Sequence, residues 1–188
     1  MRTPLRLLAL AAAFLGSAVL CLTLGVALLS STGLLGELGV ISPVLVPSGP
    51  PSPQATTQVS AQMLALYRGA ATVCPGLPWT VLAAIGTVES SNGTSELPGV
   101  HSGANYAGAE GPMQFEPSTF AEYDLPVPPG GADPPSPYDP ADAVYAAARL
   151  LCANGAADGA DISGAIYVYN HSKSYVTEVL SLAETFSK

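Results

Sequence analysis

The sequence predicts an all-α, mainly helical domain that follows an apolar N-terminal segment and a proline-rich linker. From Val59 onward, apolar residues recur at the spacing of helix faces. No segment shows a convincing strand pattern. Segments rich in Pro and Gly, such as 125–138, separate the periodic stretches, as loops between helices do. We therefore expect one domain over residues 59–188, a size that a single hydrophobic core can support.

The N-terminal segment has the length and charge pattern of a membrane anchor. The stretch 7–29 contains no charged residue, and a bilayer span needs about 20 apolar residues, whereas a cleavable signal has an apolar region of about 7–15. Arg2 and Arg6 should keep residues 1–6 in the cytoplasm. We expect a single transmembrane helix over 7–30 that holds the domain on the outer side of the cell membrane.

Two alternatives for this segment stay open. A long signal peptide cut after Ala27 would give a secreted domain. A lipoprotein anchored through Cys21 fits less well, because Leu20 is larger than the small residue that usually precedes a lipidated cysteine.

The linker, residues 31–58, is expected to be an extended stalk. It is rich in proline between Pro43 and Pro53, and this composition disfavours both helices and central strands. We expect no helix before Val59.

Capping residues set the limits of the predicted helices. Asp139 and Pro140 are suited to a cap and a first helical position, and the Asn-Gly pairs at 92–93 and 154–155 are typical helix ends. With the apolar periodicity, these signals predict helices at about 59–70, 78–91, 117–123, 139–154, 162–169 and 173–186.

The charge distribution excludes some classes of partner. All 14 acidic residues follow the apolar segment, whereas the chain has only 6 Lys and Arg, of which Arg2 and Arg6 precede it. The domain therefore has no basic surface for a nucleic-acid backbone or for anionic lipid heads. We expect no nucleic-acid partner and a monomeric protein.

Cys74 and Cys152 are the cysteines of the domain, and an exported domain permits disulfides. We expect them to form one bridge, with two buried thiols as the alternative. His101 and His171 do not lie at a spacing that would complete a zinc site with them, so no metal and no cofactor is expected.

Glu89 is the candidate catalytic residue. Leu82, Ile85 and Glu89 share one face of the second predicted helix, and Glu89 is the only charge between Arg68 and Glu96. An isolated carboxyl on an apolar face has a raised pKa. A carboxylic acid that keeps its proton near neutral pH can act as general acid at a glycosidic oxygen. The alternative is a helix-end residue that points to water.

Three short motifs add to this interpretation. Glu89-Ser90 is followed by Gly-Pro-Met-Gln-Phe at 111–115 and by Tyr169-Asn170. In their order and spacing these motifs resemble those of the soluble lytic transglycosylase family, which has the goose-type lysozyme fold. The resemblance covers about residues 75–185. Pro112 stands where the family usually has Leu, and Val168 where it usually has Ala.

The resemblance implies that the domain is lysozyme-like and cleaves the glycan strands of peptidoglycan, leaving 1,6-anhydro ends. Glu89 would be the acid and then the base. Gln114 and Tyr169 would hold the sugars and orient Glu89, and Asn170 would brace the site. The complete set of implied substrate-binding residues is Ser90, Asn105, Gly111, Met113, Gln114, Tyr169 and Asn170.

Several alternatives remain at this point. Glu110 could activate water if it faced the cleft, which would make the enzyme a lysozyme-type hydrolase; otherwise it is a solvated loop charge. Met113 and Phe115 could be core residues, and Asn170 could cap a turn. The domain could also be a non-catalytic module that binds or assembles the cell wall.

Overall fold

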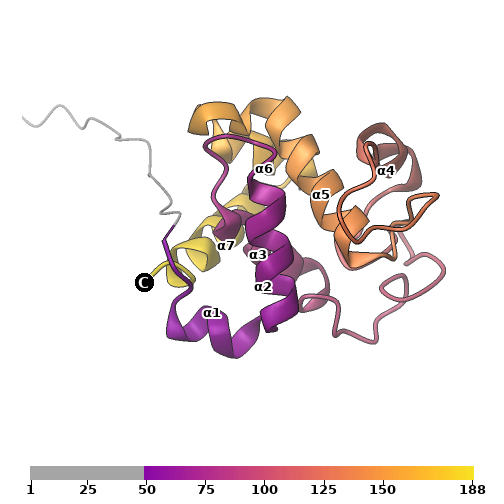
Figure 1. The fold of residues 1–188 in the computed structure, drawn as a ribbon, viewed down its shortest axis with the longest axis horizontal. Helices are drawn as coiled ribbons and strands as arrows, with labels where there is room; N and C mark the ends of the chain where they lie inside the picture. Colours follow the sequence, from indigo (N-terminus) through magenta and orange to yellow (C-terminus); the bar gives the residue numbers. More distant parts are fainter. Residues whose placement is uncertain (1–48) are drawn as a thin grey trace, which may run out of the picture. The chain divides into compact units, whose positions relative to one another are not determined.

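A computed structural model describes residues 49–188, and this part of the chain is helical, without a β-strand (Figure 1). The predicted transmembrane helix and most of the predicted linker lie outside the described residues. The α-helices are α1 (Pro53–Gln58), α2 (Ala61–Ala71), α3 (Trp79–Ser90), α4 (Pro117–Tyr123), α5 (Pro140–Leu151), α6 (Ile162–Asn170) and α7 (Lys173–Thr185). A π-helical turn η1 (Cys152–Ala156) and a 3-10 turn η2 (Ala157–Gly159) connect α5 to α6.

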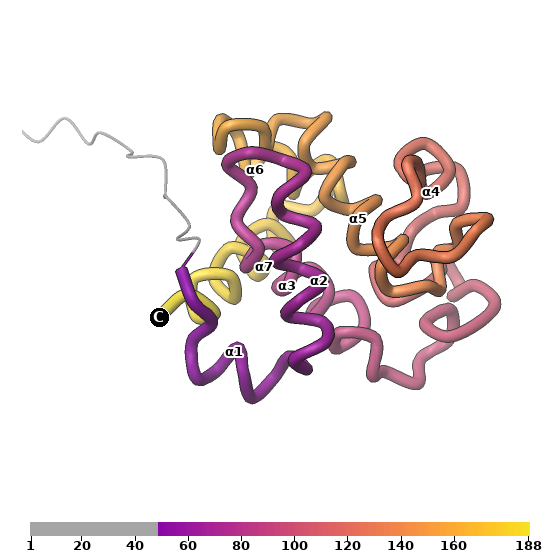
Figure 2. Tube along the Cα trace, viewed as in Figure 1, coloured from indigo at the N-terminus to yellow at the C-terminus, as the bar shows by residue number. Residues whose placement is uncertain are grey.

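Helix α3 is the central element of the core. Its residues from Trp79 to Gly86 are all buried, and it packs against α2, α5 and α7 (Figure 2). Small side chains allow this close approach. At Gly86 a Cβ atom would collide with the Tyr67 hydroxyl of α2, which donates a hydrogen bond of 2.8 Å to Asn92 Oδ1 just beyond the end of α3. These contacts of Tyr67 therefore hold the end of α3 that carries Glu89 in place.

The predicted N-terminal cap of α5 is confirmed. Asp139 accepts hydrogen bonds from the backbone N–H groups of Ala141 and Asp142, with Pro140 in the first turn. One turn on, the fully buried Asp142 carboxylate accepts hydrogen bonds from Ala132 N and Ser136 N, at 3.1 and 2.9 Å. The proline-rich segment 125–138 contains no helix, as predicted, and Asp142 holds it against the domain.

The expectation that no helix precedes Val59 is wrong. Helix α1 begins with Pro53, which is compatible with a first helical turn because the N–H it lacks would have no helical partner there. Ser52 caps the helix and also donates a hydrogen bond to Thr185 O, while Ala55 and Val59 are buried in the core. The compact domain thus includes residues that were assigned to the linker.

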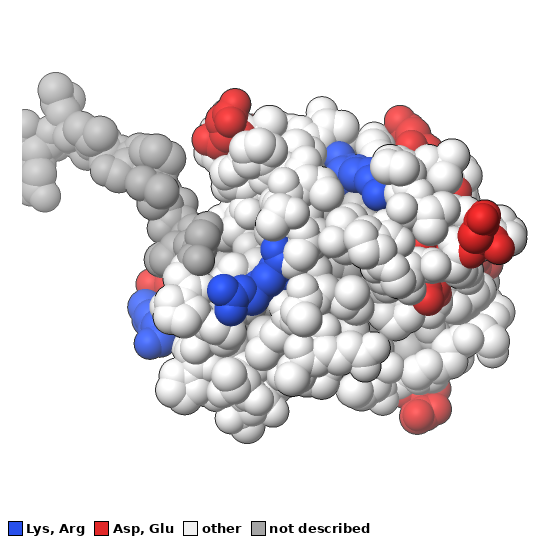
Figure 3. Space-filling model, viewed as in Figure 1, with Lys and Arg blue, Asp and Glu red and all other residues white. Residues whose placement is uncertain are grey.

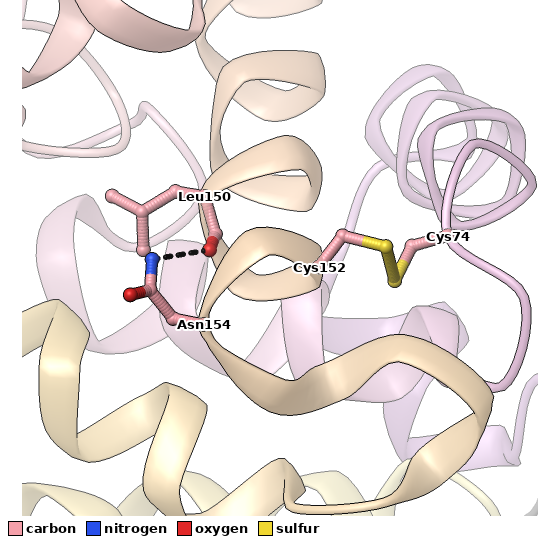
Figure 4. The surroundings of a disulfide bond; sticks show 4 residues. All are labelled: Cys74, Leu150, Cys152 and Asn154. Carbon is pink, nitrogen blue, oxygen red and sulfur yellow. Dashed lines mark hydrogen bonds between the residues drawn. A yellow bond between two sulfur atoms is a disulfide. The ribbon is translucent and has the colours of Figure 1, made fainter. Parts of the chain in front are cut away.

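The predicted Cys74–Cys152 disulfide is present in the structure (Figure 4). It connects the turn after α2 to the first residue of η1, with a Cα–Cα distance of 5.5 Å. Beside it, Asn154 Nδ2 donates a hydrogen bond of 2.8 Å to Leu150 O and stabilises the turn where α5 ends.

Charged side chains are sparse on the face of the domain that Figure 3 shows, and basic residues are few there. The only salt bridges among residues 49–188 are His101–Glu96 and Lys188–Glu184, both between exposed side chains. In the same range, none of the helices has both the length and the apolar character needed to span a bilayer.

Candidate active site

Glu89 lies in the last turn of α3, where the buried core meets a surface cleft. Leu82 and Ile85 on the same face are fully buried, and Glu89 itself is partly buried. Burial raises the pKa of the Glu89 carboxyl to about 7, although a hydrogen bond from Tyr175 lowers it. A substantial fraction of the carboxyl therefore stays protonated at neutral pH, as a general acid requires.

Tyr175 from α7 is the hydrogen-bond partner of Glu89. Its hydroxyl donates to Glu89 Oε1 at 2.5 Å, across 86 residues of sequence. Burial and the nearby Glu89 carboxylate raise the pKa of Tyr175, so the phenol keeps its proton and acts as a donor. The hydrogen bond fixes one carboxyl oxygen and leaves the other for chemistry.

Tyr169 from α6 supports Tyr175 and the loop on the other side of the site. The rings of Tyr169 and Tyr175 are stacked, with centroids 6.5 Å apart and an interplanar angle of 6°. The Tyr169 hydroxyl donates to Met113 O at 2.7 Å, and Phe115 packs edge-on against the Tyr169 ring. Tyr169 therefore connects α6, α7 and the 111–115 loop.

Ser90 and Gly111 position this loop from within the protein. The buried Ser90 hydroxyl donates to Pro112 O at 2.6 Å and accepts from Gly93 N at 2.7 Å. Gly111 has φ of +76°, and a Cβ atom there would overlap the carbonyl oxygen of Pro137. Only glycine fits this position, since it combines a left-handed conformation with a close backbone contact.

Asn105 and Gln114 form a joined pair of amides. Asn105 Nδ2 donates to Gln114 Oε1 at 2.9 Å, and Gln114 Nε2 donates to Gly111 O at 2.8 Å. Each amide nitrogen keeps a second hydrogen that can donate to a ligand. The pair thus presents neutral donors of the kind that the hydroxyl and acetamido oxygens of sugars accept.

One cleft, with a volume of about 590 Å³, collects these groups. Glu89, Asn105, Gln114, Tyr169 and Asn170 all line it. The structure therefore brings together the predicted acid and the predicted residues with polar side chains, apart from Ser90. Their roles toward a substrate stay predictions.

Three predicted substrate-binding residues lie outside the cleft lining. Met113 is fully buried, so its side chain is part of the core, and the Ser90 side chain is occupied by backbone partners. Gly111 is buried against Pro137. These residues therefore shape the loop that carries Gln114, and their contact with a substrate stays a prediction.

Glu110 does not line the cleft. Its backbone pairs with Phe115 in an isolated β-bridge. Desolvation and then the Glu110 carboxylate raise the pKa of the Tyr138 hydroxyl. Nothing in this geometry supports Glu110 as a base for water in the cleft.

Sequence reasoning missed Tyr175, although a signal was present. The apolar residues Val176 and Val179 mark the inward face of the last helix, and Tyr175 lies four residues before Val179, so it occupies the same buried stripe. A polar aromatic residue on that stripe needs a partner for its hydroxyl. Two further carboxylates, Glu116 and Glu122, line the cleft and were also not predicted.

Comparison with known proteins adds one finding. The family model described as "Transglycosylase SLT domain" matches residues 67–188, which include Glu89, the 111–115 loop, Tyr169 and Tyr175. Neither the curated proteins nor the solved structures gave a match to the chain. Within residues 49–188 no cluster of His, Cys, Asp and Glu could hold a metal ion.

Proposed function

Since the chain belongs to the transglycosylase SLT domain family and thus has a peptidoglycan-degrading function of the lytic transglycosylase type, we propose that it cleaves the β-1,4 bond after N-acetylmuramic acid and leaves a 1,6-anhydro end. The observation that carries this proposal is the Glu89 carboxyl, which lies in the cleft with a pKa of about 7 and is held by Tyr175.

In the first step the protonated Glu89 donates its proton to the glycosidic oxygen. The bond between that oxygen and the anomeric carbon of N-acetylmuramic acid breaks, and the leaving sugar departs with a new hydroxyl. The acetamido carbonyl oxygen of the substrate stabilises the positive charge that develops at the anomeric carbon, so no second carboxylate is required for this purpose.

In the second step the Glu89 carboxylate takes the proton from the 6-hydroxyl of the same sugar. The freed oxygen forms a bond with the anomeric carbon and closes the 1,6-anhydro ring. Glu89 is then protonated again, and no water is consumed. The unused amide hydrogens of Asn105 and Gln114 would orient the sugars, and Tyr175 would keep the carboxyl aligned through both steps.

Mass spectrometry of products from purified peptidoglycan tests the proposal. The wild-type protein should release muropeptides one water lighter than those with reducing ends. Glu89→Gln keeps the size of the side chain and its acceptor for Tyr175 but cannot donate the proton, so its activity should fall by about a hundredfold or more. Glu96→Gln is the matched control, because Glu96 is exposed and lies outside the cleft.

Other outcomes would separate the alternatives. Reducing ends would show attack by water and therefore a hydrolase. If the wild-type protein and Glu89→Gln were equally inactive while both bound cell-wall material, the domain would be a non-catalytic binding module.

The proposed place of action is the outer side of the cell membrane, with the domain attached through the apolar segment 7–30 and the following linker. The disulfide between Cys74 and Cys152 supports an oxidising compartment, and peptidoglycan lies outside the membrane.

A further inference from the structure

Tyr106 is unusual among the residues that line the cleft, because its side chain is fully exposed. Its relative exposure is 104%, the highest among the large hydrophobic residues exposed in the described part of the chain. It nevertheless belongs to the cleft that contains Glu89. An aromatic ring in this position contributes nothing to the core, so its apolar faces are available to a ligand.

The loop that carries Tyr106 is held rigidly by Asn105. The Asn105 side-chain oxygen accepts hydrogen bonds from Ala107 N at 2.7 Å and Ala109 N at 3.0 Å. The Asn105 backbone adds two more, from Gly108 N to its carbonyl and from its N–H to Ala109 O, each 3.0 Å. The same side chain also donates a hydrogen bond to Gln114, so Asn105 connects the loop that carries Tyr106 to the 111–115 loop. The backbone that carries the ring is therefore already ordered, so binding does not have to order the loop itself.

The charges of the residues that line the cleft limit the kinds of contact that can bind a glycan strand there. Glu89, Glu116 and Glu122 line it, and its lining contains His171 but no Lys or Arg. Peptidoglycan strands carry carboxylates on their peptide stems, and this cleft has no lysine or arginine to pair with them. Binding must then come from neutral hydrogen bonds and from apolar contact with the sugar rings.

We propose that Tyr106 is a stacking platform for a pyranose ring of the glycan strand, at a subsite on the rim of the cleft. The C–H groups on one face of the sugar would pack on the phenol ring, while the Asn105–Gln114 pair would bind polar groups of the strand deeper in the cleft. Ala107 and Ala109 are small and also line the cleft, which leaves room for the strand beside the ring. The platform favours a neutral N-acetylglucosamine ring, which has no peptide stem. The ligand class rests on the proposed function.

Calorimetric titration with a β-1,4-linked N-acetylglucosamine oligomer tests the platform in the full chain carrying Glu89→Gln, which blocks turnover. Adding Tyr106→Ala should raise the Kd about fivefold, since stacking on an aromatic ring contributes about 1 kcal/mol. Tyr106→Phe keeps the ring and should bind as the parent does. Leu97→Ala is the matched control, because Leu97 is exposed in the same segment but lies outside the cleft.

Kinetics on peptidoglycan give a second readout. In the active protein, Tyr106→Ala should raise KM and leave kcat nearly unchanged, as expected for a contact made equally in the ground state and the transition state. An unchanged Kd and KM in Tyr106→Ala, an equal loss in Leu97→Ala, or no binding of the oligomer by the parent would overturn the platform.

The two proposals can fail separately. If the wild-type protein releases anhydro products but Tyr106→Ala behaves as wild type, the proposed function stands and the platform is refuted. If Tyr106→Ala weakens binding but no variant cleaves peptidoglycan, the platform stands and the enzymatic proposal fails.

Discussion

At the scale of single residues, two opposing effects set the acidity of Glu89. Burial at the end of α3 raises the pKa of the carboxyl, and the hydrogen bond from Tyr175 lowers it, with a resulting value of about 7. Tyr175 from α7 donates its hydrogen bond to Glu89, and burial and then the Glu89 charge raise the pKa of both Tyr169 and Tyr175. No basic residue is among these causes. The carboxyl is thus suited to act first as an acid and then as a base.

Tyr175→Phe tests this balance. The wild-type rate should fall as pH rises through about 7, because the acid form of Glu89 is lost. Without the tyrosine hydroxyl, the carboxylate loses a stabilising donor, so the pKa of Glu89 rises and the alkaline limb of the pH profile moves to higher pH. The kcat should fall roughly tenfold, because the carboxyl is no longer oriented. Profiles of kcat against pH measure both effects.

Tyr138→Phe serves as the control for this experiment. It also removes a hydroxyl that donates a hydrogen bond, here to Gly103 O at 2.7 Å, but outside the cleft. Its pH profile should match that of the wild type. A downward shift of the alkaline limb in Tyr175→Phe would contradict the assigned role of the tyrosine hydroxyl.

The burial and raised pKa of Glu89 could be predicted from the sequence because the signal is local. A lone carboxylate stands on an apolar helix face, next to motifs that resemble a known family. Tyr175 was missed because its role depends on a contact between helices 86 residues apart. Ser90 and Met113 were assigned to the substrate for a related reason: a motif shows which residues recur together but not whether a side chain faces the ligand or the protein.

At the scale of elements, local signals were sufficient for most helices. Predicted segments at 117–123 and 162–169 agree with α4 and α6 to within a residue, because prolines, caps and apolar spacing act within one turn. Helix α1 was missed because its stability depends on distant partners. Ser52 N donates to Phe186 O, and Trp79 Nε1 donates to Gly49 O, both at 3.0 Å. Proline content alone could not reveal these contacts.

The 111–115 loop gives a prediction at this scale. Gly111→Ala would force a Cβ atom into the Pro137 carbonyl oxygen at a position with φ of +76°. The loop would have to shift, which would displace Gln114 and Phe115 from the cleft. We expect the free energy of unfolding to fall by roughly 2–4 kcal/mol and the activity to be largely lost. Urea denaturation followed by circular dichroism measures the first effect, and peptidoglycan cleavage the second.

Gly130→Ala separates the collision from the backbone strain. Gly130 has a similar φ of +82°, but a Cβ atom there would meet nothing within 4 Å. This variant should lose only about 1 kcal/mol of stability and keep its activity. Equal effects of the two substitutions would mean that the close contact with Pro137 does not hold the loop.

At the scale of the whole domain, the segment between the two cysteines contains the acid and most of the cleft. Residues 74–152 include α3 with Glu89, the loop with Gln114 and helices α4 and α5. Tyr169 and Tyr175 follow the second cysteine, on α6 and α7. The site thus forms only when the segment closed by the disulfide packs against the two C-terminal helices.

The disulfide should therefore matter for stability more than for catalysis. It closes a long segment, with a sequence separation of 78, and constraining the unfolded chain in this way is expected to contribute about 2–4 kcal/mol. Neither cysteine lines the cleft, so reduction should lower the Tm clearly while leaving kcat nearly unchanged at temperatures far below it. Thermal melts with and without a reductant measure the shift. The double variant with Cys74→Ala and Cys152→Ala should show the lower Tm under both conditions. If the Tm of the native protein did not change with the reductant, the bridge would not stabilise the domain.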